Sequence, residues 1–107
     1  MSIQDERVRE QLKELAARFL AMEGNKSSLM TVTNVEMSKD GKSASILFTV
    51  FPEEFEKTAL EFAKRKRSEF KKFVKDHVSF GRIPSLDFRI DIGEKNRQRI
   101  DEISQNN

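Results

Sequence analysis

The sequence contains no cysteine, no tryptophan and no tyrosine. Without cysteine, disulfides, thiolate metal sites and a cysteine nucleophile are all excluded. No stretch approaches the roughly 20 consecutive apolar residues that a membrane-spanning helix requires. Residues 1–6 hold an acidic pair instead of a basic region followed by an apolar block, which argues against a signal or transit peptide. We therefore expect a cytoplasmic protein without a membrane partner.

Glycine is also scarce, and its four copies, Gly24, Gly41, Gly81 and Gly93, stand singly. A phosphate-cradling loop needs clustered glycines, so the sequence gives no support for nucleotide hydrolysis. His77 is the single histidine and has no partner at metal-ligand spacing. Paired carboxylates fall at predicted helix ends or in the tail, where they suit the helix dipole and solubility better than acid–base catalysis. We expect no enzymatic activity, no catalytic residue, no metal, no cofactor and no small-molecule substrate.

Charge is abundant, since 36% of the 107 residues are charged, a share equal to that of the hydrophobic residues. A chain of this length forms a single domain with a modest core. Nine phenylalanines are the large side chains available to fill that core. We expect one domain over residues 1–104, a short polar tail over residues 105–107, and a monomer.

Hydrophobic periodicity predicts a mixture of helices and strands. An apolar stripe at three- and four-residue spacing marks the first helix, and Pro52 stands where the first turn of a second helix would begin. Asp40-Gly41, between two alternating segments, is typical of a β-hairpin turn. We expect helices over 4–22 and 52–78, strands over 29–38, 43–51 and 86–93, and a charged, possible helix over 94–104.

Alternation also assigns the two faces of each strand. In the first strand, strict alternation places Val35 on the face opposite to Val32. In the second strand, it places Leu47 and Phe51 together on the face opposite to the main apolar one. Two large apolar side chains on that second face indicate that it is partly covered as well.

The second helical segment is interrupted by six polar residues, 64–69, and its apolar stripe resumes at Phe70. One straight helix would face solvent all round for more than a turn there, so a break near residues 66–68 is the alternative. The resulting order is α-β-β-α(kinked)-β, an α+β domain with a three-stranded sheet and helices on one face. This is the order of the KH-like (type II) fold, whose helix–helix junction approaches the nucleic-acid backbone.

Three segments carry a family resemblance. Residues 29–40 read LMTVTNVEMSKD, residues 83–88 read IPSLDF and residues 99–103 read RIDEI. In this order they resemble the VTVTDVEVSRD, VPEL-F and RIDEL motifs of the ribosome-binding factor A family. The resemblance implies a non-catalytic assembly factor that binds the 16S rRNA of the 30S ribosomal subunit and assists its late maturation and processing, with added importance in the cold.

The sequence departs from the family at one motif. Counting back from Pro84 without gaps aligns the family's Ala-x-Gly helix kink with Lys66-Arg67-Ser68, where both small residues are missing. Serine can sit at a kink, but it opens one less readily than glycine. The first two residues of the triplet, Lys66 and Arg67, add basic charge at this place in the chain.

Positive charge is concentrated in one stretch of the chain. Between residues 61 and 82, eight Lys and Arg stand against three acidic residues, a net charge of +5 that leaves −3 for the rest. A local basic patch attracts an anionic polymer. The alternatives are a solvated helix face, or a protein–protein adaptor whose patch meets an acidic partner. The candidate RNA-binding residues are Lys64, Arg65, Lys66, Arg67, Ser68, Lys71, Lys72, Lys75 and Arg82.

Overall fold

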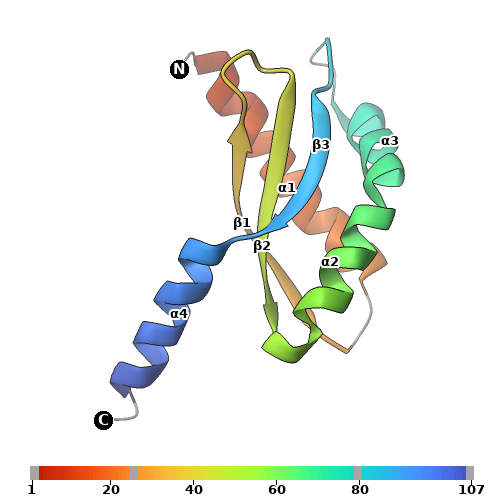
Figure 1. Ribbon diagram of the computed structural model, residues 1–107. Helices are drawn as coiled ribbons and strands as arrows, with labels where there is room; N and C mark the ends of the chain where they lie inside the picture. Colours follow the sequence, from red (N-terminus) through yellow and green to blue (C-terminus); the bar gives the residue numbers. More distant parts are fainter. Residues whose placement is uncertain (1–2, 25–26, 79–80, 106–107) are drawn as a thin grey trace.

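The fold is given by a computed structural model that describes the backbone of residues 3–24, 27–78 and 81–105 and the side chains of residues 6–24, 27–78 and 81–100. Figure 1 shows the path of the chain from α1 to α4. The elements in chain order are α1 (Ile3–Glu23), β1 (Leu29–Met37), β2 (Ser43–Phe51), the short 3₁₀ helix η1 (Glu53–Phe55), α2 (Glu56–Arg65), α3 (Arg67–His77), β3 (Ser85–Ile90) and α4 (Ile92–Gln105).

The three strands form one sheet in the order β1-β2-β3. β1 and β2 pair antiparallel through the hairpin, whereas β3 pairs parallel to β2. A parallel pair needs a crossover connection, which η1, α2 and α3 supply. The core lies between one face of this sheet and the helices α1, α2 and α3 (Figure 1). The predicted α+β architecture, a KH-like three-stranded sheet with helices on one face, is confirmed.

The hairpin turn falls at the predicted dipeptide. Gly41 has a φ of 71°, in the left-handed region that glycine enters without a Cβ clash. The Asp40 carboxylate accepts hydrogen bonds from the Ser38 hydroxyl at 2.6 Å and from the Lys42 amide at 3.0 Å. The turn therefore rests on local backbone and side-chain chemistry, which is why the sequence predicts it well.

A row of phenylalanine rings connects the helical layer to the sheet. The ring centroid of Phe70 in α3 lies 5.2 Å from that of Phe19 in α1 and 5.3 Å from that of Phe88 in β3. Phe88 in turn meets Phe48 of β2 edge-on at 6.2 Å. All four side chains are almost fully buried. Phenylalanine is thus the core-filling residue that the composition indicates, and aromatic pairs in these geometries add to the gain from burial.

The second face of β2 is covered only in part. Leu47 is buried, whereas Phe51 at the end of the strand is 72% exposed. Phe51 pairs with Leu29, the first residue of β1, and Leu29 is also exposed. The prediction of a partly covered second face is therefore confirmed, and its uncovered part is Phe51, which lies at the open end of the hairpin.

A β-bulge in β1 overturns the predicted faces of that strand. The pairing register with β2 shifts between Val32 and Asn34, so one extra residue is inserted at Thr33. The insertion changes the phase of the alternation. Val32 before the bulge and Val35 after it consequently pack against the same core, although strict alternation places them on opposite faces.

The long second helix is broken, as the polar run indicates. α2 ends at Arg65 and α3 begins at Arg67, with Lys66 between them at φ −93° and ψ 7°. The Lys66 amide still bonds back to the carbonyl of Phe62 at 3.2 Å, and the Lys66 carbonyl accepts from the Phe70 amide at 2.9 Å. The break is a sharp change of direction at which the amide and the carbonyl of Lys66 itself remain hydrogen-bonded.

The start of this helical region differs slightly from the prediction. Pro52 is not the first residue of the helix. It precedes η1, whose turn closes through a hydrogen bond from the Phe55 amide to the Pro52 carbonyl at 3.1 Å. α2 itself begins only at Glu56. Pro52 therefore fixes the chain just before a tight 3₁₀ turn instead of opening an α-helix.

The C-terminal segment forms a helix that extends away from the two packed layers (Figure 1). The strand predicted to reach residue 93 ends at Ile90, and Ile92 opens α4 with its side chain 66% exposed. Lys95 of α4 pairs with Glu53 at 2.8 Å and Glu56 at 3.1 Å, which ties the helix to η1 and α2. Residue 105 belongs to α4, and residues 106 and 107 of the predicted tail lie outside the described residues.

Candidate nucleic-acid interface

The candidate interface is built around the junction of α2 and α3, beside the edge strand β3. Both helices pack on β3 through their apolar sides, with Ala63 of α2 and Phe70 of α3 fully buried. The break at Lys66 turns the polar run outward at this point. The structure thus places the residues 64–67 at an inter-helix junction, which is where the KH-like order predicts them.

A single carboxylate, Asp87 of β3, connects the two sides of the junction. It pairs with Lys64 of α2 at 3.1 Å and with Arg67 of α3 at 3.2 Å. The Arg67 side chain also donates from Nε to the Lys64 carbonyl at 3.0 Å, which satisfies one of the unpaired carbonyls at the end of α2. Arg67 therefore fastens the end of one helix to the start of the next.

The Asp87 oxygen Oδ1 is crowded with donors. It accepts from Lys64 Nζ at 3.1 Å, from Arg67 Nη1 at 3.2 Å and from the Phe88 amide at 2.9 Å. Burial raises the pKa of the Asp87 carboxyl, but the hydrogen bonds from Lys64 and the Phe88 amide, together with the two nearby cations, outweigh it and lower the pKa below its ordinary value. Asp87 is therefore ionised at neutral pH.

Lys66 is engaged with acids as well. Its ammonium lies 3.3 Å from Glu69 of α3 and 4.0 Å from Glu23 at the end of α1, and it sits 5.7 Å from the centre of the Phe62 ring. Three of the four cations in the run, Lys64, Lys66 and Arg67, thus have carboxylate partners. These pairs are partly exposed, so each contributes little to stability and can exchange with solvent ions.

The remaining predicted cations are open to solvent. Arg65, Lys71, Lys72, Lys75 and Arg82 are exposed, and none of them lies within 4.0 Å of an acidic group in the part of the chain that the structure describes. Three of these side chains belong to α3, on the side away from the buried residues of that helix. We call Lys71, Lys72 and Lys75 the α3 lysine stripe, and the exposed Ser68 begins the same side of the helix one turn earlier.

The predicted residues are not all brought together. Lys64 to Ser68 and the α3 lysine stripe follow one another across the junction and along one helix. Arg82 lies in the segment that precedes β3, and no described contact joins it to the stripe. Arg82 can consequently contact the same ligand as the α3 lysine stripe only if that ligand is large enough to reach both the stripe and the segment before β3.

Sequence reasoning missed Asp87. The residue lies in the predicted third strand and on its wet face, but alternation alone cannot show that two helical cations reach around the sheet edge to it. The eight cations and three acids of the 61–82 stretch give the net charge of that stretch of sequence. They do not include the acids that tertiary structure adds from β3 and α1, namely Asp87 and Glu23.

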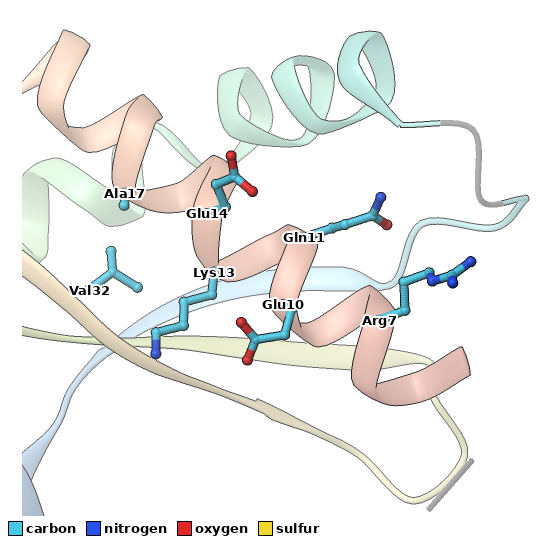
Figure 2. A pocket seen from close by; sticks show the side chains of 7 residues that line it. All are labelled: Arg7, Glu10, Gln11, Lys13, Glu14, Ala17 and Val32. Atoms are coloured by element: carbon cyan, nitrogen blue, oxygen red, sulfur yellow. The ribbon is translucent and has the colours of Figure 1, made fainter. Parts of the chain in front are cut away.

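A second surface, on α1 and β1, is less suited to phosphate. A hollow of about 380 Å³ there is lined by both signs of charge, with Arg7 and Lys13 against Glu10 and Glu14. Figure 2 shows these acidic and basic side chains interleaved along the outer side of α1. Fields of opposite sign cancel at this spacing, so the hollow lacks the single-sign potential that attracts an anionic polymer.

None of the described helices has the length and apolar character needed to cross a membrane. Within the same residues, no three His, Cys, Asp or Glu side chains are grouped so that they could hold a metal ion.

Comparison with known proteins gives a consistent family match. The sequence profile of the ribosome-binding factor A family matches residues 4–104. Ribosome-binding factor A from Macrococcus caseolyticus (strain JCSC5402) is 31% identical over an alignment 112 positions long, which covers 98% of each chain.

Solved structures agree with the sequence match. The crystal structure of ribosome-binding factor A from Thermus thermophilus superposes with a TM-score of 0.69 at 28% identity, over 79% of this chain and 93% of that one. A homology model of the Thermus thermophilus factor, fitted into a cryo-electron-microscopy map of its complex with the 30S subunit, superposes with a TM-score of 0.66 at 29% identity. That comparison covers 76% of this chain and 88% of the other.

Proposed function

Because the chain belongs to the ribosome-binding factor A family, and is in that sense a ribosome-binding factor, we propose that it binds the 16S rRNA of the 30S subunit and assists its late maturation. In this proposal the protein acts as a monomer in the cytoplasm, makes and breaks no covalent bond, uses no cofactor, and leaves when the subunit is mature. The similar Thermus thermophilus factor in complex with a 30S subunit supports the proposed partner.

The observation that carries the proposal is the α3 lysine stripe beside the helix junction. Its three ammonium groups are exposed and have no acidic partner among the described residues, so they can meet phosphates without first giving up an ion pair. Cations that contact phosphates release condensed counterions, and this release favours binding. Helical RNA is recognised largely through its shape and backbone, which suits a charged helix better than a base-reading pocket.

The junction residues complete the proposed interface. Arg65 and Ser68 are exposed on either side of Lys66 and bring the surface of α2 next to the stripe. Lys64, Lys66 and Arg67 retain donors beyond those they use on carboxylates, because an ammonium has three donors and a guanidinium five. Arg82 joins the interface if the RNA extends toward β3. The proposed RNA-binding residues are therefore the nine predicted from the sequence.

A charge-removal experiment tests this assignment. The triple variant Lys71→Gln, Lys72→Gln, Lys75→Gln should lose most of its co-sedimentation with immature 30S subunits, while its circular dichroism spectrum and melting temperature stay close to those of the parent. A matched control replaces three exposed lysines elsewhere, Lys39, Lys42 and Lys57, by glutamine and removes the same charge. Equal binding by the two triple variants would remove the stripe from the interface.

Salt dependence separates RNA from an acidic protein partner. Each phosphate contacted should contribute a slope of about −0.7 to −0.9 to the plot of log affinity against log salt concentration. The triple variant, which loses three such contacts, should therefore show a slope shallower by about 2 to 3 than the parent when bound to isolated 16S rRNA. Binding that survives complete digestion of the rRNA would favour the adaptor function instead.

A further inference from the structure

The donors around Asp87 form an arrangement that suits an oxyanion. Two cations from different helices, Lys64 and Arg67, and the backbone amide of Phe88 all point at the single oxygen Oδ1, at 2.9–3.2 Å. Cations combined with a main-chain amide are a common way to hold a phosphate oxygen. In this chain the oxygen belongs to the protein's own carboxylate.

The arrangement is open to the solvent. The side chains of Lys64 and Asp87 are each 39% exposed, and that of Arg67 is 49% exposed. Partly exposed ion pairs of this kind contribute little to stability, so exchange of one anion for another is close to balanced. A phosphate arriving from solution can therefore reach the same donors that Asp87 holds.

We propose that Lys64, Arg67 and the Phe88 amide form a phosphate-binding site that the Asp87 carboxylate occupies while no RNA is bound. The RNA part of this proposal rests on the proposed function, in which the junction meets a sugar–phosphate chain. A backbone phosphate that enters the site takes over the donors, and the Asp87 carboxylate turns away into solvent. Asp87 thus limits the affinity of the junction for RNA and makes release easier.

The position of Asp87 favours this role over a purely structural one. Arg67 also holds the Lys64 carbonyl through Nε, so one link between the helices persists after the carboxylate leaves. The Phe88 amide is the neighbour of Asp87 in the chain, so the site keeps its backbone donor when the side chain moves. The α3 lysine stripe begins one turn beyond Arg67, which lets neighbouring phosphates of one strand contact both.

The first test uses inorganic phosphate on the isolated protein. Titration at constant ionic strength is followed by ¹⁵N NMR at the Phe88 amide and at Arg67 Nε, in the parent, in Asp87→Asn and in Asp87→Ala. Saturable shifts at both nuclei should appear in the Asp87 variants with an apparent Kd about fivefold lower than in the parent, the size of one unit-charge interaction at about 4 Å in water. The control Glu94→Gln removes the same charge from the Glu94–Arg97 pair on α4 and should behave as the parent.

The second test uses 30S subunits over a range of salt concentrations. Asp87→Asn should bind more tightly at low salt and should steepen the log–log slope by about 0.7 to 0.9 for each phosphate gained. Weaker binding by a folded Asp87→Asn protein, or unchanged signals of Phe88 and Arg67 in the phosphate titration, would overturn the proposal. The isosteric asparagine keeps the test valid if the alanine variant unfolds.

The two tests separate this proposal from the proposed function. If phosphate enters the site in the Asp87 variants while neither they nor the parent bind 30S subunits, the phosphate site stands and the ribosomal function fails. If the parent binds 30S subunits with a steep salt slope that the Asp87 variants do not alter, the function stands and the role of Asp87 fails.

Discussion

At the point where β3 becomes α4, the Asp91 carboxylate holds two separate parts of the chain. Its Oδ1 accepts from the Glu94 amide at 3.0 Å, which caps the first turn of α4, and its Oδ2 accepts from the Thr33 hydroxyl at 2.5 Å. The Asp91 amide meanwhile continues the sheet by donating to the Phe48 carbonyl at 2.8 Å. The sequence alternates through this point, so its period predicts a longer strand. The strand ends at Ile90 and α4 begins at Ile92 because the Asp91 cap supplies a partner for the Glu94 amide, which would otherwise have none.

Replacing Asp91 by alanine should lower the free energy of unfolding by about 1–2 kcal/mol, since the cap is lost and the Thr33 hydroxyl keeps only the Leu47 carbonyl, at 3.2 Å, as an acceptor. Chemical denaturation measures this change. Asp76→Ala is the matched control, because Asp76 is exposed near the C-terminal end of α3, where a negative charge is unfavourable. Asp91→Asn should recover part of the loss, because the amide oxygen can still accept from Glu94. Equal stability of the two alanine variants would contradict the capping role.

The carboxylates of Asp91 and Asp87 make the stability of the fold depend on pH. Burial raises the pKa of the Asp91 carboxyl, but hydrogen bonds from Thr33 and the Glu94 amide outweigh it and lower the pKa below its ordinary value of 3.8, as also happens at Asp87. The unfolded chain therefore binds these protons more readily than the folded one. Their contribution to stability is complete above about pH 4–5 and is lost as the pH falls through the lower, folded pKa values.

Thermal midpoints measured from pH 7 to pH 2 should therefore fall steadily on the acid side of pH 4. The double variant Asp87→Asn, Asp91→Asn should start with a lower midpoint at pH 7 and lose less of it on acidification. A parent midpoint that stays level down to pH 2 would contradict the account of both carboxylates.

At the level of elements, the sequence predicts the break between α2 and α3 but not how it is stabilised. Six polar residues in an apolar stripe are enough to place the break near Lys66. Neither Lys66 at the break nor Ser68, which aligns with the glycine of the family motif, has a positive φ, so the junction does not need a glycine. Arg67 supports the turn by donating to the Lys64 carbonyl. That contact follows from the folded geometry, and no sequence period signals it.

Arg67→Ala should lower the free energy of unfolding by about 1 kcal/mol, because the Lys64 carbonyl loses its donor and Asp87 loses one cation. Arg65→Ala is a control two residues away, since Arg65 is exposed and has no acidic partner among the described residues. It should change the stability by less than about 0.5 kcal/mol. An Arg67→Ala protein as stable as Arg65→Ala would show that the junction does not depend on this side chain.

The bulge in β1 is a second feature of the elements that the sequence does not predict. The alternating pattern predicts the strand and its pairing, and Asp40-Gly41 predicts the turn. Neither predicts the extra residue at Thr33, because the bulge is stabilised by Asp91, 58 positions away in the sequence. Its effect is to bring Val32 and Val35 to the same core.

At the level of the whole molecule, ion pairs attach the C-terminal helix α4 to the rest of the domain. Acidic groups of η1 and α2 hold α4 through Lys95 and through Arg99, which lies 2.6 Å from Glu53. The cations of Lys95 and Arg99 lower the pKa of the Glu53 carboxyl below its ordinary value. Among the described side chains of α4, which end at residue 100, the large apolar ones, Ile92 and Ile100, are exposed. Within the described residues, α4 is therefore attached mainly by these ion pairs.

Glu53→Gln should loosen α4 without disturbing the two packed layers. Amide hydrogen exchange should become faster in α4 and stay unchanged in α1, and the effect of the variant should shrink at high salt, where exposed ion pairs are screened. Uniform exchange rates in the parent and the variant would show that α4 is held by other contacts.

The proposed interface is only partly predictable from the sequence. Composition and motif order predict a basic patch at a helix junction, and the structure places residues 64–67 there. The division between cations held by acids and the open α3 lysine stripe depends on Asp87 and Glu23, which reach the junction from other elements. Tertiary contacts therefore decide which cations are free to meet a phosphate.

Site-specific photo-crosslinking to immature 30S subunits tests the proposed interface most directly. A photoreactive residue at Lys72 should crosslink to 16S rRNA at a few defined nucleotides. A photoreactive residue at the exposed Asn96 should not share those nucleotides, because Asn96 belongs to α4, the helix that extends away from α3 in Figure 1. Crosslinks from position 72 to ribosomal proteins alone, or to the same nucleotides as position 96, would contradict an RNA interface on the α3 lysine stripe.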